Sequence, residues 1–196
     1  LELPTRPLFA ALTLATIIAW PVAALAQPRS ASPPAREAEA PGSATALVGT
    51  ACEGLPVRVA VPPAGDSRDV MDACTGARNA LAFFGTLGLQ AIDGLVIEIV
   101  APLPAVAGPT AAGCFIEARK RIYLVPFRTF LKQKTWFGIP ITRDLYRSLA
   151  THEAAHALAA CHFAVPDPTI QAKEYIAYVA TFSMMPSAVR ERALRA

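Results

Sequence analysis

Residues 142–163 read TRDLYRSLATHEAAHALAACHF, and this stretch decides the fold that the sequence predicts. Thr142 is a residue type favoured at the N-cap of a helix, and the leucines that follow it recur at helical spacing. His152 and His156 continue the same inward-facing stripe, one turn apart. The pattern therefore predicts a helix over residues 143–163 whose buried face carries two imidazoles.

The two histidines have the spacing to bind one metal ion. On a helix, His152 and His156 lie about 40° apart around the axis, so one tetrahedral ion can contact both rings. Glu153 lies one step further round, where its carboxylate could contact water on the metal. The segment is a complete H-E-x-x-H motif, in which two histidines bind Zn²⁺ and the glutamate is the general base of hydrolysis. A purely structural role is the alternative for a pair of helical histidines.

The N-terminal segment predicts export. A basic residue precedes an apolar stretch that a proline interrupts, and Ala24-Leu25-Ala26 supplies the small residues of a signal-peptidase site. We expect residues 1–26 to be a secretory signal peptide, which makes the protein periplasmic or secreted without stable membrane association; an uncleaved anchor is the alternative. Residues 27–47 are rich in Pro, Ala and Ser and are expected to be a linker. Residues 48–196 then form the folded domain.

Length and charge restrict the function classes. A chain of 196 residues has room for one ordinary domain and an N-terminal extension. The formal net charge is only +3, and the basic residues are dispersed except for short runs at 119–121 and 190–195. This distribution argues against a nucleic-acid partner. The sequence does not decide the oligomeric state.

Four cysteines in an exported chain favour disulfides over free thiols and permit three connectivities. The expected topology favours Cys52 with Cys74 and Cys114 with Cys161, because each pair would link neighbouring elements. Four buried thiols are the alternative.

Upstream of the motif helix, apolar runs alternate with turn residues. The order strand, helix, strand, hairpin, helix, helix predicts an α+β fold, in which a small mixed sheet with an edge hairpin packs on the motif helix. The expected elements are strands at 57–61 and 95–100, a helix from about residue 67 to residue 85, a hairpin of 114–118 and 122–125, a loop at 127–140 and a last helix at 168–184.

The hairpin, the H-E-x-x-H helix and the helix after it resemble the zincin metalloproteases, over about a third of the chain. The chain is also similar to small exported bacterial domains of unassigned function that place a Glu-Tyr pair after the motif, here Glu174-Tyr175. The zincin resemblance implies a zinc-dependent hydrolase, a peptidase that acts on a protein or peptide. It also implies a substrate-aligning edge strand, for which residues 122–125 are the candidate.

The third metal ligand separates the zincin clans, and the chain offers two candidates. Metzincins place a histidine where His162 stands, after a glycine that is Ala159 here. Without that glycine the helix should continue and turn His162 about 100° away from the shared face. Gluzincins instead supply a glutamate from the next helix. In this chain the next helix is expected to begin with Asp167 as its N-cap and Pro168 as its first residue, and it carries Glu174. We therefore expect Glu174 to be the third ligand, with a surface ion pair as its alternative.

Tyr178 lies on the same predicted face as Glu174. In several zincins a tyrosine donates a hydrogen bond to the developing oxyanion, and the resemblance implies this catalytic role for Tyr178; simple packing is its alternative. Two other functions compete with a peptidase. One is an exported, disulfide-stapled binding domain with an inert motif, and the other is a zinc-binding pseudoenzyme without hydrolytic activity.

Overall fold

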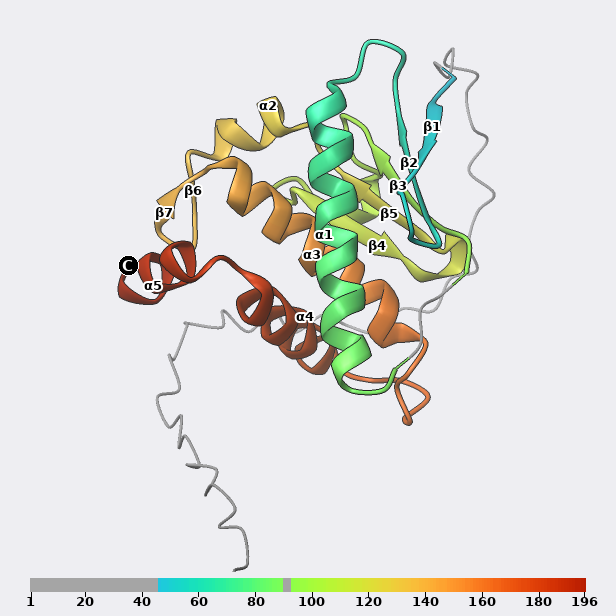
Figure 1. Ribbon diagram of the computed structural model, residues 1–196, viewed down its shortest axis with the longest axis vertical. Coiled ribbons are helices and arrows are strands. Elements are labelled where there is room, and N and C mark those ends of the chain that lie inside the picture. The colour runs from blue at the N-terminus through green and yellow to red at the C-terminus, as the bar shows by residue number, and fades with distance from the viewer. Residues whose placement is uncertain (1–45, 90–92) are drawn as a thin grey trace, which may run out of the picture. The chain divides into compact units, whose positions relative to one another are not determined.

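The computed structural model describes residues 46–89 and 93–196 (Figure 1). The expected signal peptide at 1–26 lies outside the described residues, and so does the expected linker at 27–47 apart from its last two residues. Within the described ranges, no helix is both long enough and apolar enough to span a bilayer.

A mixed sheet and helices on one of its faces confirm the α+β class. The sheet has the order β1-β2-β3-β5-β4 in the described part of the chain. Strands β2, β3 and β5 are parallel, whereas β1 and β4 are antiparallel to their neighbours. The strands are β1 Val48–Ala51, β2 Val57–Val61, β3 Leu95–Ile99, β4 Gly113–Ile116 and β5 Arg121–Leu124, and a separate small hairpin pairs β6 Thr135–Trp136 with β7 Ile139–Pro140.

The three longest helices match the predicted order, with differences at their ends, whereas the helices at residues 127–130 and 187–195 were not predicted. The helices are α1 Ser67–Thr86, α2 Phe127–Phe130, α3 Arg143–Ala160, α4 Ile170–Met184 and α5 Ser187–Arg195, with short 3-10 helices at η1 Ala105–Ala107, η2 Glu117–Arg119 and η3 Leu131–Gln133. The motif helix α3 ends at Ala160 and not at residue 163. Helix α4 begins later than expected, because Thr169 is the N-cap and its hydroxyl accepts from the amide of Ala172. The expected loop at 127–140 contains α2, η3 and the β6–β7 hairpin.

The expected substrate edge at 122–125 is wrong. Strand β5 lies between β3 and β4, so it has no free edge. Ile122 and Leu124 are both fully buried, whereas the residues of β4 are only half-buried. The hydrogen bonds of β5 to both neighbours place it inside the sheet, and β4 is the edge strand.

Helices α1 and α3 cover the same face of the sheet and contact each other closely at small residues. Helix α1 lies against β2 and β3, and α3 lies against β4 and β5. Gly76 on α1 faces Ala150 on α3 so closely that a Cβ atom at position 76 would overlap the Cβ of Ala150. Helix α4 packs on α3 and also contacts α1. Because Gly76 and Ala150 are small, the backbones of α1 and α3 lie directly against each other.

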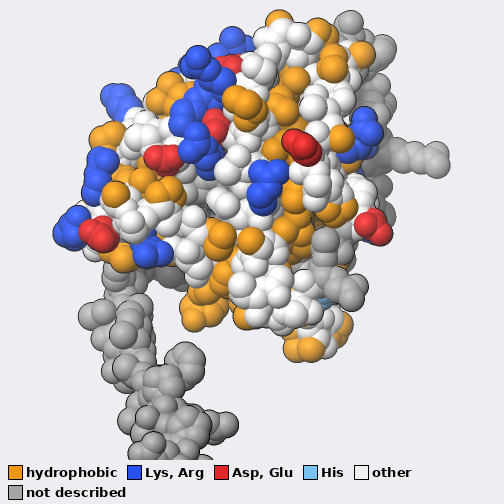
Figure 2. All heavy atoms as spheres, viewed as in Figure 1, with side chains coloured by type: hydrophobic (Ala, Val, Ile, Leu, Met, Phe, Trp, Pro, Cys, Tyr) orange, Lys and Arg blue, Asp and Glu red, His pale blue; other side chains and the backbone are white. Residues whose placement is uncertain are grey.

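An ionic cluster joins the N-terminal ends of α1 and α3. The guanidinium of Arg143 donates to Asp69 at 2.6 Å, to Asp72 at 2.9 Å and to Asp66 at 3.1 Å. Asp69 and Asp72 are buried, and Arg143 also lies 4.0 Å from the centre of the Phe127 ring. On the face drawn in Figure 2, basic side chains are interspersed with acidic ones instead of forming a patch of one sign.

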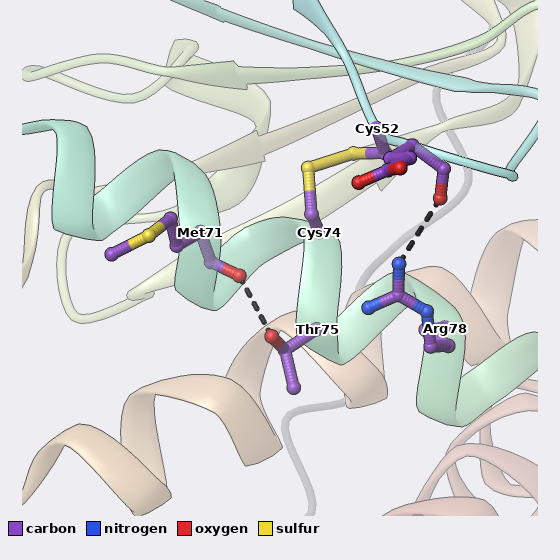
Figure 3. Close-up of a disulfide and its surroundings, with 6 residues drawn as sticks. Cys52, Met71, Cys74, Thr75 and Arg78 are labelled. Atoms are coloured by element: carbon purple, nitrogen blue, oxygen red, sulfur yellow. Dashed lines mark hydrogen bonds between the residues drawn. A yellow bond between two sulfur atoms is a disulfide. The ribbon is translucent and has the colours of Figure 1, made fainter.

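One of the two expected disulfides is present. Cys52, just after β1, is bonded to Cys74 on α1, and the nearby Arg78 donates to the carbonyl of Glu53 (Figure 3). The predicted bond between Cys114 and Cys161 is wrong, because both residues are free thiols. Cys114 faces the cavity described below, whereas Cys161 is an exposed residue that follows the end of α3.

Candidate metal centre

Helix α3 holds the motif residues in a buried position. The hydroxyl of Thr142 accepts from the amide of Leu145 and so caps the first turn, as expected. His152 and Glu153 are each 6% exposed, and His156 is half-buried. The apolar stripe of the helix therefore places the histidines beneath the edge of the sheet.

Glu174 joins the two histidines in a group that could hold a metal ion. The Nε2 atoms of His152 and His156 are 3.1 Å apart. The carboxylate of Glu174 places Oε2 3.3 Å from the Nε2 of His152 and Oε1 3.3 Å from the Nε2 of His156. His162 is exposed beyond the end of α3 and is not a member of this group. The structure thus brings together the three residues predicted as ligands.

The charges of the group depend on one another. Hydrogen bonds from both imidazoles hold the pKa of Glu174 well below its usual range. Burial lowers the pKa of His152, whereas the hydrogen bond to Glu174 and nearby negative charges outweigh burial and raise the pKa of His156. Burial raises the pKa of Glu153 to about 7. An ionised Glu174 is therefore available as a ligand at neutral pH.

Thr181 orients one of the histidines, and the sequence analysis did not identify it. Its Oγ1 lies 3.4 Å from the Nδ1 of His152 and donates a 2.7 Å hydrogen bond to the carbonyl of Ala177. Because that proton is already used, the hydroxyl is an acceptor for His152 when the imidazole proton lies on Nδ1, and in this tautomer Nε2 is free to bind a metal. Thr181 follows Glu174 by seven residues, or two helical turns, so the two lie on the same helix face. This spacing is the sequence feature that could have identified Thr181.

Tyr178 lies beside the group but does not line its cavity. The centre of its ring is 4.6 Å from that of His152, and on the other side it contacts Phe137 at 5.9 Å. The side chain is 38% exposed. Contact with His152 is thus the role of Tyr178 that the structure describes.

A cavity of about 350 Å³ opens beside the group, between α3, α4 and the edge strand β4. His152, Glu153, His156 and Glu174 all line it. Gly113 forms the opposite wall so closely that a Cβ atom there would lie 2.7 Å from the Cγ of Glu153. The sequence analysis missed Gly113, because only the pairing of β4 with β5 brings it over α3.

Comparison with known protein families matches residues 59–196 to a family of unknown function, DUF6639. Comparisons with curated proteins and with solved structures return no match. The matched region contains α1, most of β2, strands β3 and β5, the edge strand β4 and the helices that carry the metal-ligand group. It covers well over half of the sequence, so the chain belongs to DUF6639, a family of unknown function.

Proposed function

We propose that this protein is a zinc-dependent hydrolase, and specifically a peptidase. The observation that carries the proposal is how closely the ligand atoms lie. The two imidazole Nε2 atoms are 3.1 Å apart, and each lies 3.3 Å from one of the two carboxylate oxygens of Glu174. Neighbouring corners of a tetrahedron with metal–ligand distances of about 2.0–2.1 Å lie about 3.3–3.4 Å apart. Two imidazole nitrogens and one carboxylate are a ligand set of catalytic zinc, and they leave a fourth position open.

Zinc, when bound, would supply a Lewis acid that polarises a carbonyl and makes water more acidic. Glu153 lines the same cavity without belonging to the ligand group, which suits it to act as the general base. Its carboxylate would take a proton from the attacking water and pass it to the leaving amine as the C–N bond breaks. Thr181 would hold His152 in the tautomer that binds metal.

Edge strand β4 supports a peptide as the substrate. Its outer edge pairs with no further strand among the described residues, and it borders the cavity that contains Glu153. An extended peptide can add to such an edge through backbone hydrogen bonds, which favours a peptide chain over a compact substrate. Strand β4, which we propose aligns the substrate, borders the same cavity as the motif residues.

For Tyr178 we propose the hydrogen bond to the oxyanion as a further catalytic contribution. Contact with the ring of His152 places it next to the metal ligands, which supports this role. Replacing it with phenylalanine keeps the ring contact and removes only the hydroxyl, so a fall in kcat without loss of zinc would separate catalysis from packing. The Cys52–Cys74 disulfide is consistent with the proposed export.

Metal analysis and peptide cleavage by the purified protein test the proposal together. We expect close to one zinc per chain and cleavage of some members of a peptide library. The Glu153→Gln variant should keep the metal and lose at least about a hundredfold in kcat/KM, because only the proton acceptor is removed. Zinc without any cleavage would favour the pseudoenzyme, and a chain without zinc would favour the binding domain.

A further inference from the structure

Two cavities adjoin where α4 begins. The cavity at the metal-ligand group and a second cavity of about 240 Å³ share four lining residues, Glu117, Ala160, Phe163 and Lys173. Residues 165–168 form much of the remaining wall of the second cavity. Lys173 therefore lies where the two cavities adjoin.

Lys173 is the one lysine or arginine among the described residues that line these two cavities. Its side chain is half-buried, and its ammonium forms no ion pair within 4.0 Å in the described ranges. Lys173 directly precedes Glu174 in α4, which keeps it beside the metal-ligand group. Cavity walls displace part of the water around a charge, so an incoming anion is attracted more strongly to a lysine without a counterion there than to a fully exposed lysine.

The acidic side chains of the second cavity do not satisfy Lys173. Glu117 and Asp167 line that cavity, but both residues are exposed. Water and salt screen exposed charges strongly, which weakens any attraction of these carboxylates for a basic substrate. Glu117 and Lys173 are the charged residues that line both cavities, and Lys173 is the less exposed and so the less screened of the two.

We infer that Lys173 binds a carboxylate of the substrate at the junction of the two cavities. This inference rests on the proposed function and narrows its substrate class to peptides with an acidic group close to the bond that is cleaved. The carboxylate has two possible sources, which are the free C-terminus of the peptide and an Asp or Glu side chain. A charge-assisted hydrogen bond to the ammonium would fix the position of the peptide relative to Glu153.

Peptide binding tests the inference independently of catalysis. Glu153→Gln is introduced into every protein, so that bound peptides are not cleaved. Calorimetric titration then compares the acetylated tetrapeptide Ala-Ala-Phe-Ala as a free acid with the same peptide as its C-terminal amide. A second pair, both amidated, carries Glu or Gln in place of Phe. Preference within the first pair identifies the C-terminus as the carboxylate, and preference within the second identifies a side chain.

The protein with Lys173 should bind the acid of one pair about tenfold more tightly than its neutral partner. Lys173→Met should abolish this preference, and Lys173→Arg should restore part of it. Lys132→Met is the matched control, because Lys132 is an exposed lysine that lines neither cavity, and it should change nothing. Circular dichroism of each variant verifies that it is folded.

The inference is overturned if the parent shows no preference in either pair, or if Lys173→Met keeps the preference. Its failure is distinct from failure of the proposed function. If cleavage depends on Glu153 but not on Lys173, the protein is a peptidase without this carboxylate site. If the preference depends on Lys173 but the protein cleaves no peptide, the carboxylate site exists and the protein is not a peptidase.

Discussion

Gly113→Ala tests whether the close approach of the edge strand to Glu153 positions the general base. The new Cβ would lie 2.7 Å from Cγ, 2.8 Å from Oε1 and 2.9 Å from Cδ of Glu153. An ordinary contact begins at 3.4 Å, so the glutamate side chain must move by at least 0.7 Å. All three of these atoms belong to a flexible side chain beside a cavity, so the carboxylate can swing aside while the fold is kept.

Misplacing a catalytic group by about 1 Å can lower the rate by about a hundredfold. We therefore expect Gly113→Ala to reduce kcat/KM by about ten- to a hundredfold, while zinc affinity stays within about twofold because no ligand moves. The assay is peptide hydrolysis beside zinc titration with a competing chelator. Gly85→Ala is the control, because a Cβ atom there meets nothing within 4 Å, and its activity should equal that of the parent. Unchanged activity of Gly113→Ala, or loss of its zinc, would refute the reasoning.

Three further predictions address the metal ligands and the fold. Glu174→Ala should weaken zinc binding by more than about a hundredfold, because it removes a direct ligand. His162→Ala should leave zinc binding unchanged. Both affinities are measured by chelator titration, and the reverse result would make His162 the ligand. Thr181→Val should weaken zinc binding by about ten- to a hundredfold, because Nδ1 of His152 loses its acceptor, and full affinity in this variant would contradict the assigned tautomer. Arg143→Met should lower the free energy of unfolding by about 3 kcal/mol, because it leaves buried carboxylates with fewer partners. In the same urea titration the exposed Arg195→Met should cost less than about 1 kcal/mol, and equal losses would show that the ionic cluster contributes little.

Local patterns were enough to predict most of the elements. The period of apolar residues and the capping residue Thr142 predicted α3, and alternation between apolar runs and turns predicted β2, α1, β3 and the β4–β5 hairpin. His152 and His156 could be named as ligand candidates because they lie one helical turn apart, whereas Glu174 was named from the zincin resemblance. These features depend on the sequence within a few turns of each residue.

Features that depend on contacts between distant segments were mispredicted or missed. The order of strands in a sheet is not encoded in any one strand, so the edge was assigned to β5 instead of β4. Pairing of Cys114 with Cys161 was inferred from an assumed topology and failed for the same reason. Gly113 matters because β4 brings it against Glu153 on α3, and this contact between distant segments cannot be predicted from the sequence around Gly113. The zincin resemblance itself stays a prediction.

The approach of Gly76 to Ala150 limits how this protein can change over generations. A Cβ atom at position 76 would also lie 2.7 Å from the carbonyl oxygen of Arg147 and 2.8 Å from the amide nitrogen of Thr151, so backbone, and not a movable side chain, blocks it. Even alanine would force α1 and α3 apart, and α3 carries the histidines. A substitution at Gly76, which touches none of the three ligand residues, could thus misalign the metal-ligand group. Position 76 therefore tolerates glycine and no larger residue.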